Sequence, residues 1–330
     1  MTDKVRWGVL GVARVARNWM LPAFLMSQQA EVVAVASRQL DRARLCATAH
    51  GIARAYGSYD ALLSDPDVEA VYIPLPNHLH KEWALAALCA GKHVLCEKPI
   101  ALAAADAVEI AHAARSAERL VAEAFMYRYS PLMRAVRDIV NSGRLGDLRL
   151  MHTSFAFQVP DDPTNVHLQA AAGGGCLYDI GCYAVHAQRL VSGREPRQAW
   201  ATLSRSPKHA VDMSCAGTLD YGGLYGTFEV SYGAFRTNTL RLVGTEGVLQ
   251  TPDGFTPRNE PALLLVQSGR LTERLVTPAA NPYLLQIEDF SETVRGRHAL
   301  DGAQEALDAN TRVLDACLAS AGSGAPVKLS

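Results

Sequence analysis

The sequence has no excess of charge of either sign. Its 32 basic residues are balanced by 33 acidic ones, which gives a net charge of -1, and no long run of one sign occurs along the chain. Proteins that bind nucleic acid or an anionic membrane surface usually present a strong positive field. The composition therefore excludes nucleic acid and membrane surfaces as expected partners.

Paired cysteines and long apolar runs are also missing. The seven cysteines are scattered and form no C-x-x-C pair, and His78 and His80 lie without a third ligand at a suitable spacing, so neither disulfides nor a metal is expected. No stretch approaches the roughly 20 apolar residues of a membrane helix. The first residues, MTDKVRWGVLG, hold no signal-peptide core. These absences predict a cytoplasmic protein.

The first part of the chain alternates between two kinds of segment. From Val5 to about Phe125, short Val-rich runs alternate with amphipathic stretches, which predicts strand-helix-strand units and a parallel sheet. Pro22 is expected to break the first helix in two. The predicted strands cover residues 5–11, 31–37, 70–76, 92–98 and 119–125.

The pattern changes after residue 125. A helix is predicted at 130–142, followed by strands from about 147 with hairpin turns such as 244–247, and these indicate a mainly antiparallel sheet. Because 330 residues exceed the roughly 250 to 300 that one core usually serves, two domains are expected, 1–125 and 126–330. The fold class is therefore α/β, with a doubly wound parallel sheet followed by an α+β domain. Closing elements are predicted at 281–296, 302–320 and 325–330.

The first strand runs into a glycine-containing turn, GVLGVARVA. Gly11, Ala13 and Ala16 occupy the three small-residue positions of a G-x-G-x-x-G fingerprint. Small residues there let backbone amides and a helix N-terminus approach a pyrophosphate. The alternative is a tight strand-to-helix turn without a ligand. The residues of this turn expected to contact a dinucleotide are Gly8, Gly11, Ala13, Arg14 and Val15.

The second strand ends differently from a typical NAD site. Ser37 and Arg38 stand where such a site usually carries the Asp or Glu that holds the ribose diol. A serine hydroxyl with Arg38 and Arg42 would accept a 2'-phosphate, which a carboxylate would repel. The sequence therefore favours NADP(H) over NAD(H). The alternative is two solvated arginines at the start of a helix.

Two further strands run into polar loops, PLPNHLH and CEKPIA. In a doubly wound sheet, ligands bind beyond the carboxyl ends of the strands. Asn77, His80, Glu97 and Lys98 are therefore expected to face the cofactor. Two residues of the first loop, Pro74 and Leu75, are included in the predicted cofactor site.

The segment GGGCLYDIGCYAVHAQRL carries a third group of polar residues. If it is helical, Asp179, Tyr183 and His186 lie at i, i+4 and i+7, so a carboxylate, a phenol and an imidazole share one face. Tyr183 could instead be an amphipathic core residue whose hydroxyl is satisfied by the backbone.

With AGKHVLCEKPIA at 90–101, the chain strongly resembles the glucose-fructose oxidoreductase, inositol dehydrogenase and MocA family. The segments FMYRYSP, GGGCLYDIGCY, GTEG and NPYLLQIEDF extend the resemblance over essentially the whole chain. The resemblance implies an oxidoreductase with an N-terminal Rossmann-type domain. It also implies a C-terminal domain with an open sheet that often joins subunits, so a homo-oligomer, dimer or tetramer, is expected.

The family's helix motif DxGxHxxD falls on Asp179, Gly181, Tyr183 and His186, with tyrosine where many members have histidine. This places the chain in a branch similar to sugar dehydrogenases and dimeric dihydrodiol dehydrogenase. The resemblance implies hydride transfer between nicotinamide and a sugar-like pyranose, keto-sugar or polyol. Tyr183 would donate or accept the proton, and Lys98 would assist because a free phenol titrates near 10.

Other residues take expected roles from the same resemblance. Asp179 would hold a substrate hydroxyl or balance Lys98, and His167 and His186 would contact the substrate. Arg128 would contact the cofactor or pin an interdomain hinge. The glycines before residue 176 would let the helix approach the nicotinamide. The alternative functions are a trans-dihydrodiol dehydrogenase and a non-catalytic regulatory protein that senses NADP.

Overall fold

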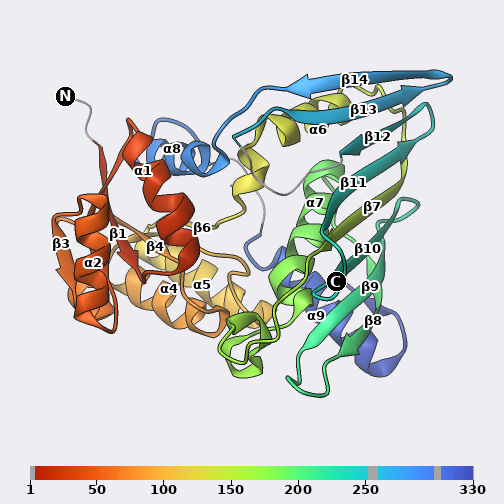
Figure 1. Cartoon of the computed structure of the whole chain (residues 1–330). Coiled ribbons are helices and arrows are strands. Elements are labelled where there is room, and N and C mark those ends of the chain that lie inside the picture. The colour runs from red at the N-terminus through yellow and green to blue at the C-terminus, as the bar shows by residue number, and fades with distance from the viewer. Residues whose placement is uncertain (1–3, 252–258, 301–305, 330) are drawn as a thin grey trace. The chain divides into compact units, whose positions relative to one another are not determined.

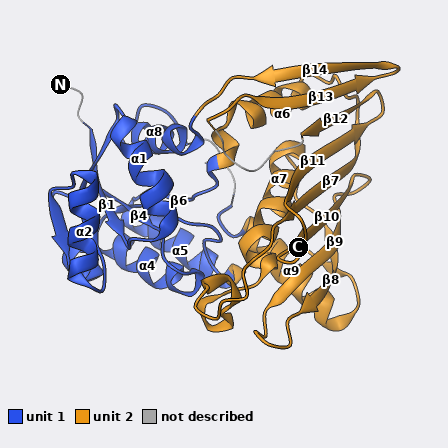
Figure 2. Cartoon of the chain, in the orientation of Figure 1, with its two compact units in different colours: residues 1–101, 105–126, 281–308 blue, residues 102–104, 127–280, 309–330 orange. Residues whose placement is uncertain are grey.

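The computed structural model describes residues 4–251, 259–300 and 306–329, which form two compact units (Figures 1 and 2). The described residues of unit 1 fall within 1–101, 105–126 and 281–308, and those of unit 2 within 102–104, 127–280 and 309–330. The chain passes from one unit to the other at residues 126 and 127, next to the predicted boundary. The segment after residue 280, however, returns to unit 1, where the prediction had placed it in the second domain.

Unit 1 is built on a six-stranded parallel sheet in the order β3-β2-β1-β4-β5-β6. All five predicted strands are present, and the sixth, β3, was not predicted because it is a three-residue, half-buried edge strand without an apolar run. The strands are β1 (Val5–Leu10), β2 (Ala30–Ala36), β3 (Arg54–Tyr56), β4 (Ala70–Ile73), β5 (His93–Cys96) and β6 (Val121–Glu123). The helices of this unit are α1 (Leu21–Met26), α2 (Leu40–His50), α3 (Tyr59–Leu63), α4 (His80–Cys89), α5 (Ala104–Ala117) and α8 (Pro282–Val294).

The first helix is not broken at Pro22. Helical residues run from Arg14 to Met26, with a π-helical turn at Ala16–Met20 directly before α1. Proline lacks an N–H and crowds the preceding turn, and a π turn relieves both problems by locally shifting the hydrogen-bond pattern. The expected break is therefore replaced by a local widening of the helix.

Helix α8 packs on one face of the parallel sheet. The ring of Trp7, in β1, lies 5.2 Å from the ring of Phe24 in α1 and 5.1 Å from that of Phe290 in α8. Its indole N–H also donates to the hydroxyl of Ser291 at 3.2 Å. These buried contacts explain why a segment so late in the chain belongs to unit 1.

An ion pair fixes the direction of α8. Just beyond its last turn, Arg295 donates to both carboxylate oxygens of Glu69, at 2.8 and 3.0 Å, and to the Lys4 carbonyl at 2.9 Å. Lys4 and Glu69 precede β1 and β4, so α8 ends at the amino edge of the sheet. Its first turn consequently lies toward the carboxyl edge, where ligands bind in this class of sheet.

A buried glutamine in α8 gives a stability prediction. Gln286 is 1% exposed, and neither atom of its side-chain amide has a hydrogen-bond partner among the described residues. An unpaired buried polar group costs roughly 1 to 3 kcal/mol. Gln286→Met, which has a similar volume, should raise the free energy of unfolding by about 1 kcal/mol in urea titrations.

Gln188, in unit 2, offers the matched control. It is fully buried as well, but its amide donates to the hydroxyl of Thr153 at 2.9 Å and to the Thr227 carbonyl at 2.8 Å. Gln188→Met should therefore lower the free energy of unfolding by about 1 to 3 kcal/mol. Equal effects of the two substitutions would contradict the assignment.

Unit 2 is built on a nine-stranded sheet in the order β14-β13-β12-β11-β7-β10-β9-β8-β15. Within the described residues, β7 and β10 pair in parallel and the other neighbouring strands pair antiparallel, so the predicted, mainly antiparallel sheet is confirmed. The strands are β7 (Leu148–Ala156), β8 (Gln198–Arg205), β9 (Asp212–Asp220), β10 (Tyr225–Ser231), β11 (Thr237–Gly244), β12 (Gly247–Thr251), β13 (Ala262–Ser268), β14 (Leu271–Thr277) and β15 (Val327–Lys328).

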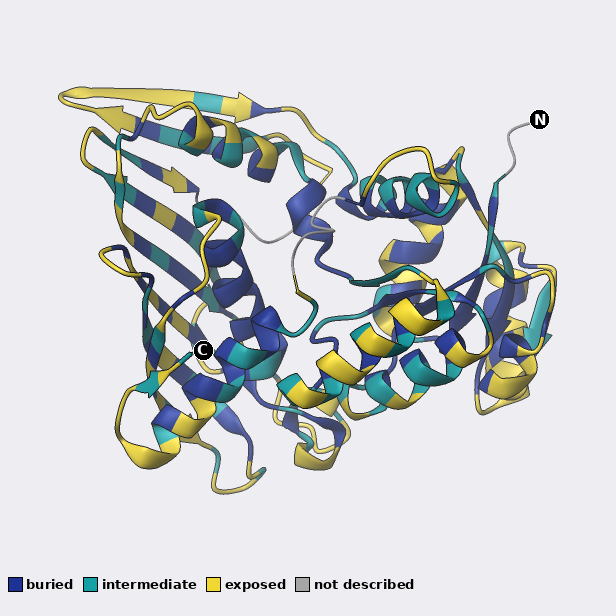
Figure 3. Cartoon of the chain, turned by 180° about the vertical axis from the view of Figure 1, so that it is seen from behind, coloured by how far each residue is buried: buried dark blue, intermediate teal, exposed yellow. Residues whose placement is uncertain are grey.

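Helices α6 (Pro131–Asn141), α7 (Cys182–Ser192) and α9 (Ala309–Ser323) lie against this sheet (Figure 1). The strands alternate between buried and exposed residues, as in β10, so one face of the sheet is left uncovered by the residues that the structure describes (Figure 3). The helix predicted at 302–320 begins at Ala309 in the described chain, and residues 301–305 lie outside it. In the described residues, no helix has the length and apolar character needed to cross a membrane.

Candidate functional site

The turn after β1 fits a dinucleotide. Gly11 has a φ of +115°, in the left-handed region that favours glycine, and its N–H donates to the Ala36 carbonyl at 2.9 Å. A Cβ at this position would lie 2.9 Å from the Leu75 side chain. A helix follows from Arg14, so free backbone amides and a helix start stand at the carboxyl end of β1, where a pyrophosphate binds. Ala13 and Val15 are partly exposed on this turn.

Gly8 has a packing role that the sequence did not indicate. It lies inside β1 and is buried, and an added Cβ would stand 2.5 Å from the side chain of Leu62 and 3.1 Å from that of Val68. Because side chains alternate along a strand, Gly8 faces α3 and Trp7 faces α1 and α8. Close packing against α3 is therefore sufficient to require glycine here.

Arg38 and Arg42 lie just after the end of β2, where the sequence predicts a 2'-phosphate contact. Arg38 and Arg42 are exposed, and the charges of both act on the hydroxyl of Tyr59, to which Arg38 also donates a hydrogen bond. Burial raises the pKa of Tyr59, and the two guanidinium groups counteract part of that rise. Ser37 is buried, and its hydroxyl accepts a hydrogen bond from the backbone N–H of Gln39 at 3.3 Å. Two cations beside one hydroxyl at this edge fit a phosphate group.

The structure corrects the prediction for His80, which does not face a cofactor. The ring is fully buried, with Nδ1 2.7 Å from the Pro99 carbonyl and Nε2 2.7 Å from the Leu75 carbonyl. Burial lowers the pKa of His80 to about 4. His80 therefore ties the loop after β4 to the segment after β5. In the first of these loops Pro74 is buried and Asn77 is partly exposed.

Glu97 and Lys98 follow β5 directly, and both are partly exposed. The hydroxyl of the fully buried Tyr72 donates to Glu97 Oε1 at 2.5 Å. Burial, and then the charge of Glu97, raise the pKa of Tyr72, so this phenol stays protonated and acts as a donor. The hydroxyl of Tyr72, in β4, thus fixes the Glu97 carboxylate next to Lys98, the residue predicted to act in catalysis.

The predicted helix of unit 2 is present but begins irregularly. Residues Leu177–Gly181 form a π-helical turn that continues into α7. The π turn contains Asp179, while Tyr183 and His186 lie in α7, so the three residues do not follow one regular helical face. Such π turns are frequent at functional sites.

Asp179 is held by two side chains from other elements. The Tyr232 hydroxyl lies 2.6 Å and His167 Nδ1 2.9 Å from its Oδ2 atom. Burial, followed by the charge of Asp179, raises the pKa of Tyr232 well above its usual value, which keeps this phenol a donor. Tyr232 was missed at the sequence level because nothing near it in the chain connects it to Asp179.

The glycines before this helix, Gly174 and Gly175, lie too close to neighbouring groups to carry a side chain. Gly175 has a φ of +117°, and an added Cβ would overlap the carboxylate of Asp212. A Cβ on Gly174 would lie 2.6 Å from the His167 carbonyl. Asp212 Oδ2 in turn accepts from the Leu177 N–H at 2.6 Å, at the start of the helix. These contacts within unit 2 account for glycine at both positions.

Tyr183 lies among aromatic rings. It is 7% exposed, and its ring centre lies 5.7 Å from that of Tyr127 and 5.6 Å from that of Phe155. His186 is buried, with Nδ1 2.5 Å from the Tyr127 hydroxyl. This burial goes against the predicted contact of His186 with a substrate hydroxyl and makes it a partner of Tyr127, which the sequence had not singled out.

Arg128, His78 and His167 were also considered from the sequence, as a cofactor, metal and substrate contact respectively. Arg128 is largely buried in unit 2, with its guanidinium 6.0 Å from the ring centre of Tyr129. His78 is exposed, and no group of three metal-ligating side chains occurs in the part of the chain that the structure describes. His167 is partly exposed beside Asp179, as a substrate contact would require.

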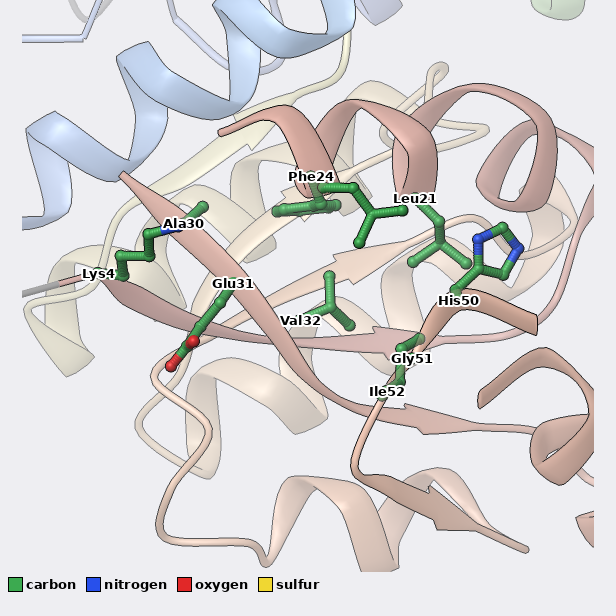
Figure 4. A pocket seen from close by; sticks show the side chains of 10 residues that line it. Lys4, Leu21, Phe24, Ala30, Glu31, Val32, His50, Gly51 and Ile52 are labelled. Carbon is green, nitrogen blue, oxygen red and sulfur yellow. The ribbon is translucent and has the colours of Figure 1, made fainter. Parts of the chain in front are cut away.

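A hollow of about 230 Å³ lies elsewhere in unit 1, between α1, the start of β2 and the end of α2. Lys4 and Glu31 stand at one end and His50 at the other (Figure 4). Since Lys4 precedes β1 and Ala30 begins β2, the hollow lies at the amino edge of the sheet. It is therefore separate from the glycine turn and the loops that fit a dinucleotide.

Comparison with known proteins agrees with this architecture. Residues 5–125 match a family model described as an oxidoreductase family with an NAD-binding Rossmann fold, and residues 133–250 match a GFO/IDH/MocA C-terminal domain. A D-xylose 1-dehydrogenase (NADP(+)) of Haloferax volcanii is 35% identical and covers 98% of this chain and 99% of its own. A trans-1,2-dihydrobenzene-1,2-diol dehydrogenase of Bos taurus is 34% identical, with 92% and 89% covered.

A solved structure is similar over nearly the same length. The 3-ketoreductase KijD10 of Actinomadura kijaniata, in complex with NADP and TDP-benzene, superimposes with a TM-score of 0.90 at 31% identity, covering 96% of this chain and 98% of its own. Fold and site together define an oxidoreductase with an NAD(P)-binding Rossmann unit. The chain belongs to the GFO/IDH/MocA oxidoreductase family.

Proposed function

We propose that this chain is an NADP(H)-dependent oxidoreductase that acts on a CH–OH group of a pyranose, keto-sugar or polyol. The observation that carries the proposal is the carboxylate of Asp179, oriented by Tyr232 and His167 and followed one turn later by Tyr183. A fixed carboxylate is suited to binding a hydroxyl group, and a phenol can transfer its proton. Relatives named a D-xylose dehydrogenase and a 3-ketoreductase support a sugar-like substrate.

Each side chain has one task in the proposed reaction. When bound, the nicotinamide cofactor supplies or accepts the hydride. Tyr183 gives its proton to the substrate oxygen in reduction and takes it back in oxidation. Lys98 stabilises the negative charge that develops on that oxygen, and Asp179 accepts a hydrogen bond from a neighbouring hydroxyl. The solved structures of the 3-ketoreductase include variants in which a lysine or a tyrosine was replaced.

A substrate screen tests the proposal. Pyranoses, keto-sugars and polyols are offered with NADP and with NADPH, and turnover is followed at the absorbance band of the reduced nicotinamide. We expect turnover of at least one sugar-like compound. Tight NADPH binding without turnover of any sugar, polyol or diol would instead favour a regulatory protein that senses NADP.

Cofactor preference gives a separate prediction. Because the guanidinium groups of Arg38 and Arg42 would pair with a 2'-phosphate, Arg38→Ala should weaken NADP binding by about tenfold and leave the Kd for NAD nearly unchanged. Isothermal titration with both cofactors measures the two values. Arg44→Ala, at an exposed position of α2, is the control. An unchanged ratio of the two Kd values in Arg38→Ala would refute the NADP assignment.

A second candidate substrate class is a trans-dihydrodiol. The observation in its favour is the set of aromatic rings around Tyr183 and Asp179, which includes Phe155 and Phe157, since such rings suit a carbocycle. The relative from Bos taurus is named for that activity. Including a trans-dihydrodiol in the screen separates the two classes by kcat/KM.

We also propose that the chain forms a homo-oligomer through the open face of the sheet in unit 2. Tyr225 and Leu150 are opposite each other on β10 and β7, and both are about half exposed. Val243 and Val248 continue this row across β11 and β12. An apolar row across an uncovered sheet favours burial against a second copy. Light scattering that shows a monomer would contradict it.

A further inference from the structure

Unit 1 presents a half-exposed tryptophan supported by a buried tyrosine. Trp19 is 50% exposed, and its ring lies 5.9 Å from that of Tyr283 at an interplanar angle of 15°. We propose that the open face of Trp19, backed by Tyr283, binds the apolar face of the substrate ring. This inference rests on the proposed function, because it assigns a contact to the ring of the same sugar-like substrate.

Both rings are held by their backbones. Trp19 lies in the π turn Ala16–Met20, between residues whose side chains are buried in unit 1. Tyr283 is 7% exposed in the first turn of α8, where Asn281 Oδ1 accepts from its N–H at 3.1 Å and from the Leu284 N–H at 3.3 Å. A capped helix start fixes the tyrosine, and the stacked tyrosine covers one face of the indole. The pair is therefore preorganised.

The pair also lies at the correct edge of the sheet. The charges of Glu97 and Lys98 both act on the Tyr283 hydroxyl, which places the first turn of α8 close to the end of β5. Burial and Glu97 raise the pKa of Tyr283, while Lys98 lowers it, and the phenol stays protonated. The aromatic pair thus neighbours the lysine proposed to act on the substrate oxygen.

The chemistry of the pair selects one face of a ligand. An indole offers a large, rigid apolar surface that costs little conformational entropy on binding. A pyranose or a carbocyclic diol has polar hydroxyl edges and an apolar C–H face, so it can stack on Trp19 while its hydroxyl groups meet charged residues. Single exposed apolar side chains are common on protein surfaces and do not by themselves indicate a binding site. Trp19 differs from them because its ring stacks on the buried ring of Tyr283, which neighbours Lys98.

Steady-state kinetics tests the inference on the full-length protein. Trp19→Ala should raise KM for the best substrate of the screen about tenfold, with kcat changed less than about threefold and the Kd for NADPH unchanged. Trp19→Phe, which keeps an aromatic ring, should have a KM close to that of the wild type. Phe235→Ala removes an exposed aromatic side chain of unit 2 and should leave all three constants unchanged.

Two kinetic outcomes would overturn the inference. An unchanged KM in Trp19→Ala would show that the ring does not bind substrate. A weaker Kd for NADPH with an unchanged KM would show that the ring contacts the cofactor instead. Both outcomes require turnover by the wild-type protein, so they differ from failure of the proposed function, in which the wild type itself turns over no substrate.

An equilibrium binding measurement tests the inference even if the wild-type protein turns over no substrate in the screen. Tryptophan fluorescence of the NADPH-loaded Tyr183→Phe protein is followed while the best substrate, or D-xylose if the screen finds none, is added. We expect a saturable change that disappears in the Tyr183→Phe, Trp19→Phe double variant. A change that persists in the double variant, or no change in the single variant, would overturn the inference.

Discussion

Replacing Tyr183 with phenylalanine should lower kcat by about 10²- to 10⁴-fold, the usual contribution of a positioned acid or base. The substitution removes only the hydroxyl and keeps the ring that packs against Tyr127 and Phe155, so the fold should persist. Binding of NADPH, measured by its fluorescence, should be unchanged. A fall in kcat with an unchanged cofactor Kd would assign the proton transfer to this phenol.

Tyr127→Phe is the matched control. The Tyr127 hydroxyl lies 2.5 Å from His186 Nδ1, and the Tyr127 ring neighbours that of Tyr183. The substitution therefore removes a second phenol hydroxyl from the same aromatic cluster. We expect a loss in kcat of less than about tenfold, because this hydroxyl orients a buried ring and takes no part in proton transfer. Similar losses in both variants, or an active Tyr183→Phe protein, would contradict the proposed mechanism.

Replacing Lys98 with methionine should lower kcat by about 10²- to 10³-fold, the typical cost of losing one group that stabilises a developing oxyanion. Methionine keeps much of the side chain's length and loses the charge. The hydrogen bond from Tyr72 to Glu97 does not involve Lys98, so the end of β5 should keep its structure. The measurement is single-turnover hydride transfer at saturating cofactor and substrate, which separates chemistry from binding.

Lys98→Arg separates charge from position. It keeps the positive charge but spreads it over a planar group, so part of the activity should return. If methionine and arginine at this position gave the same rate as the wild type, Lys98 would have no role in the chemical step. If only the KM for NADPH changed, Lys98 would serve cofactor binding instead.

The parts of the site that lie next to each other in the chain could be predicted. The glycine turn after β1, Ser37 and Arg38 after β2, and Glu97 and Lys98 after β5 all follow strands whose apolar runs are evident. Because parallel strands bring their carboxyl ends to one edge, these predictions placed the loops at the same end of the sheet. A helical segment around Tyr183 could be predicted as well, but the π turn that holds Asp179 could not.

The parts that depend on distant segments could not. His80 has the composition and position of a cofactor contact, yet two backbone carbonyls enclose its ring. Tyr232 reaches Asp179 from 53 positions away. Helix α8 follows strands β7 to β14 of the second sheet in the chain but packs on the first sheet, because Phe290 and Ser291 complete the surroundings of Trp7.

Strand and helix periodicity, turn glycines and the charge at strand ends are properties of neighbouring residues, and they were sufficient for the fold class and for the loops that fit a dinucleotide. Which polar side chains become buried braces, and which remain exposed to meet a ligand, depends on packing between segments far apart in the chain. Burial and hydrogen-bond partners of this kind arise only when those segments are folded together. His80 and Tyr232 obtained their roles in this way.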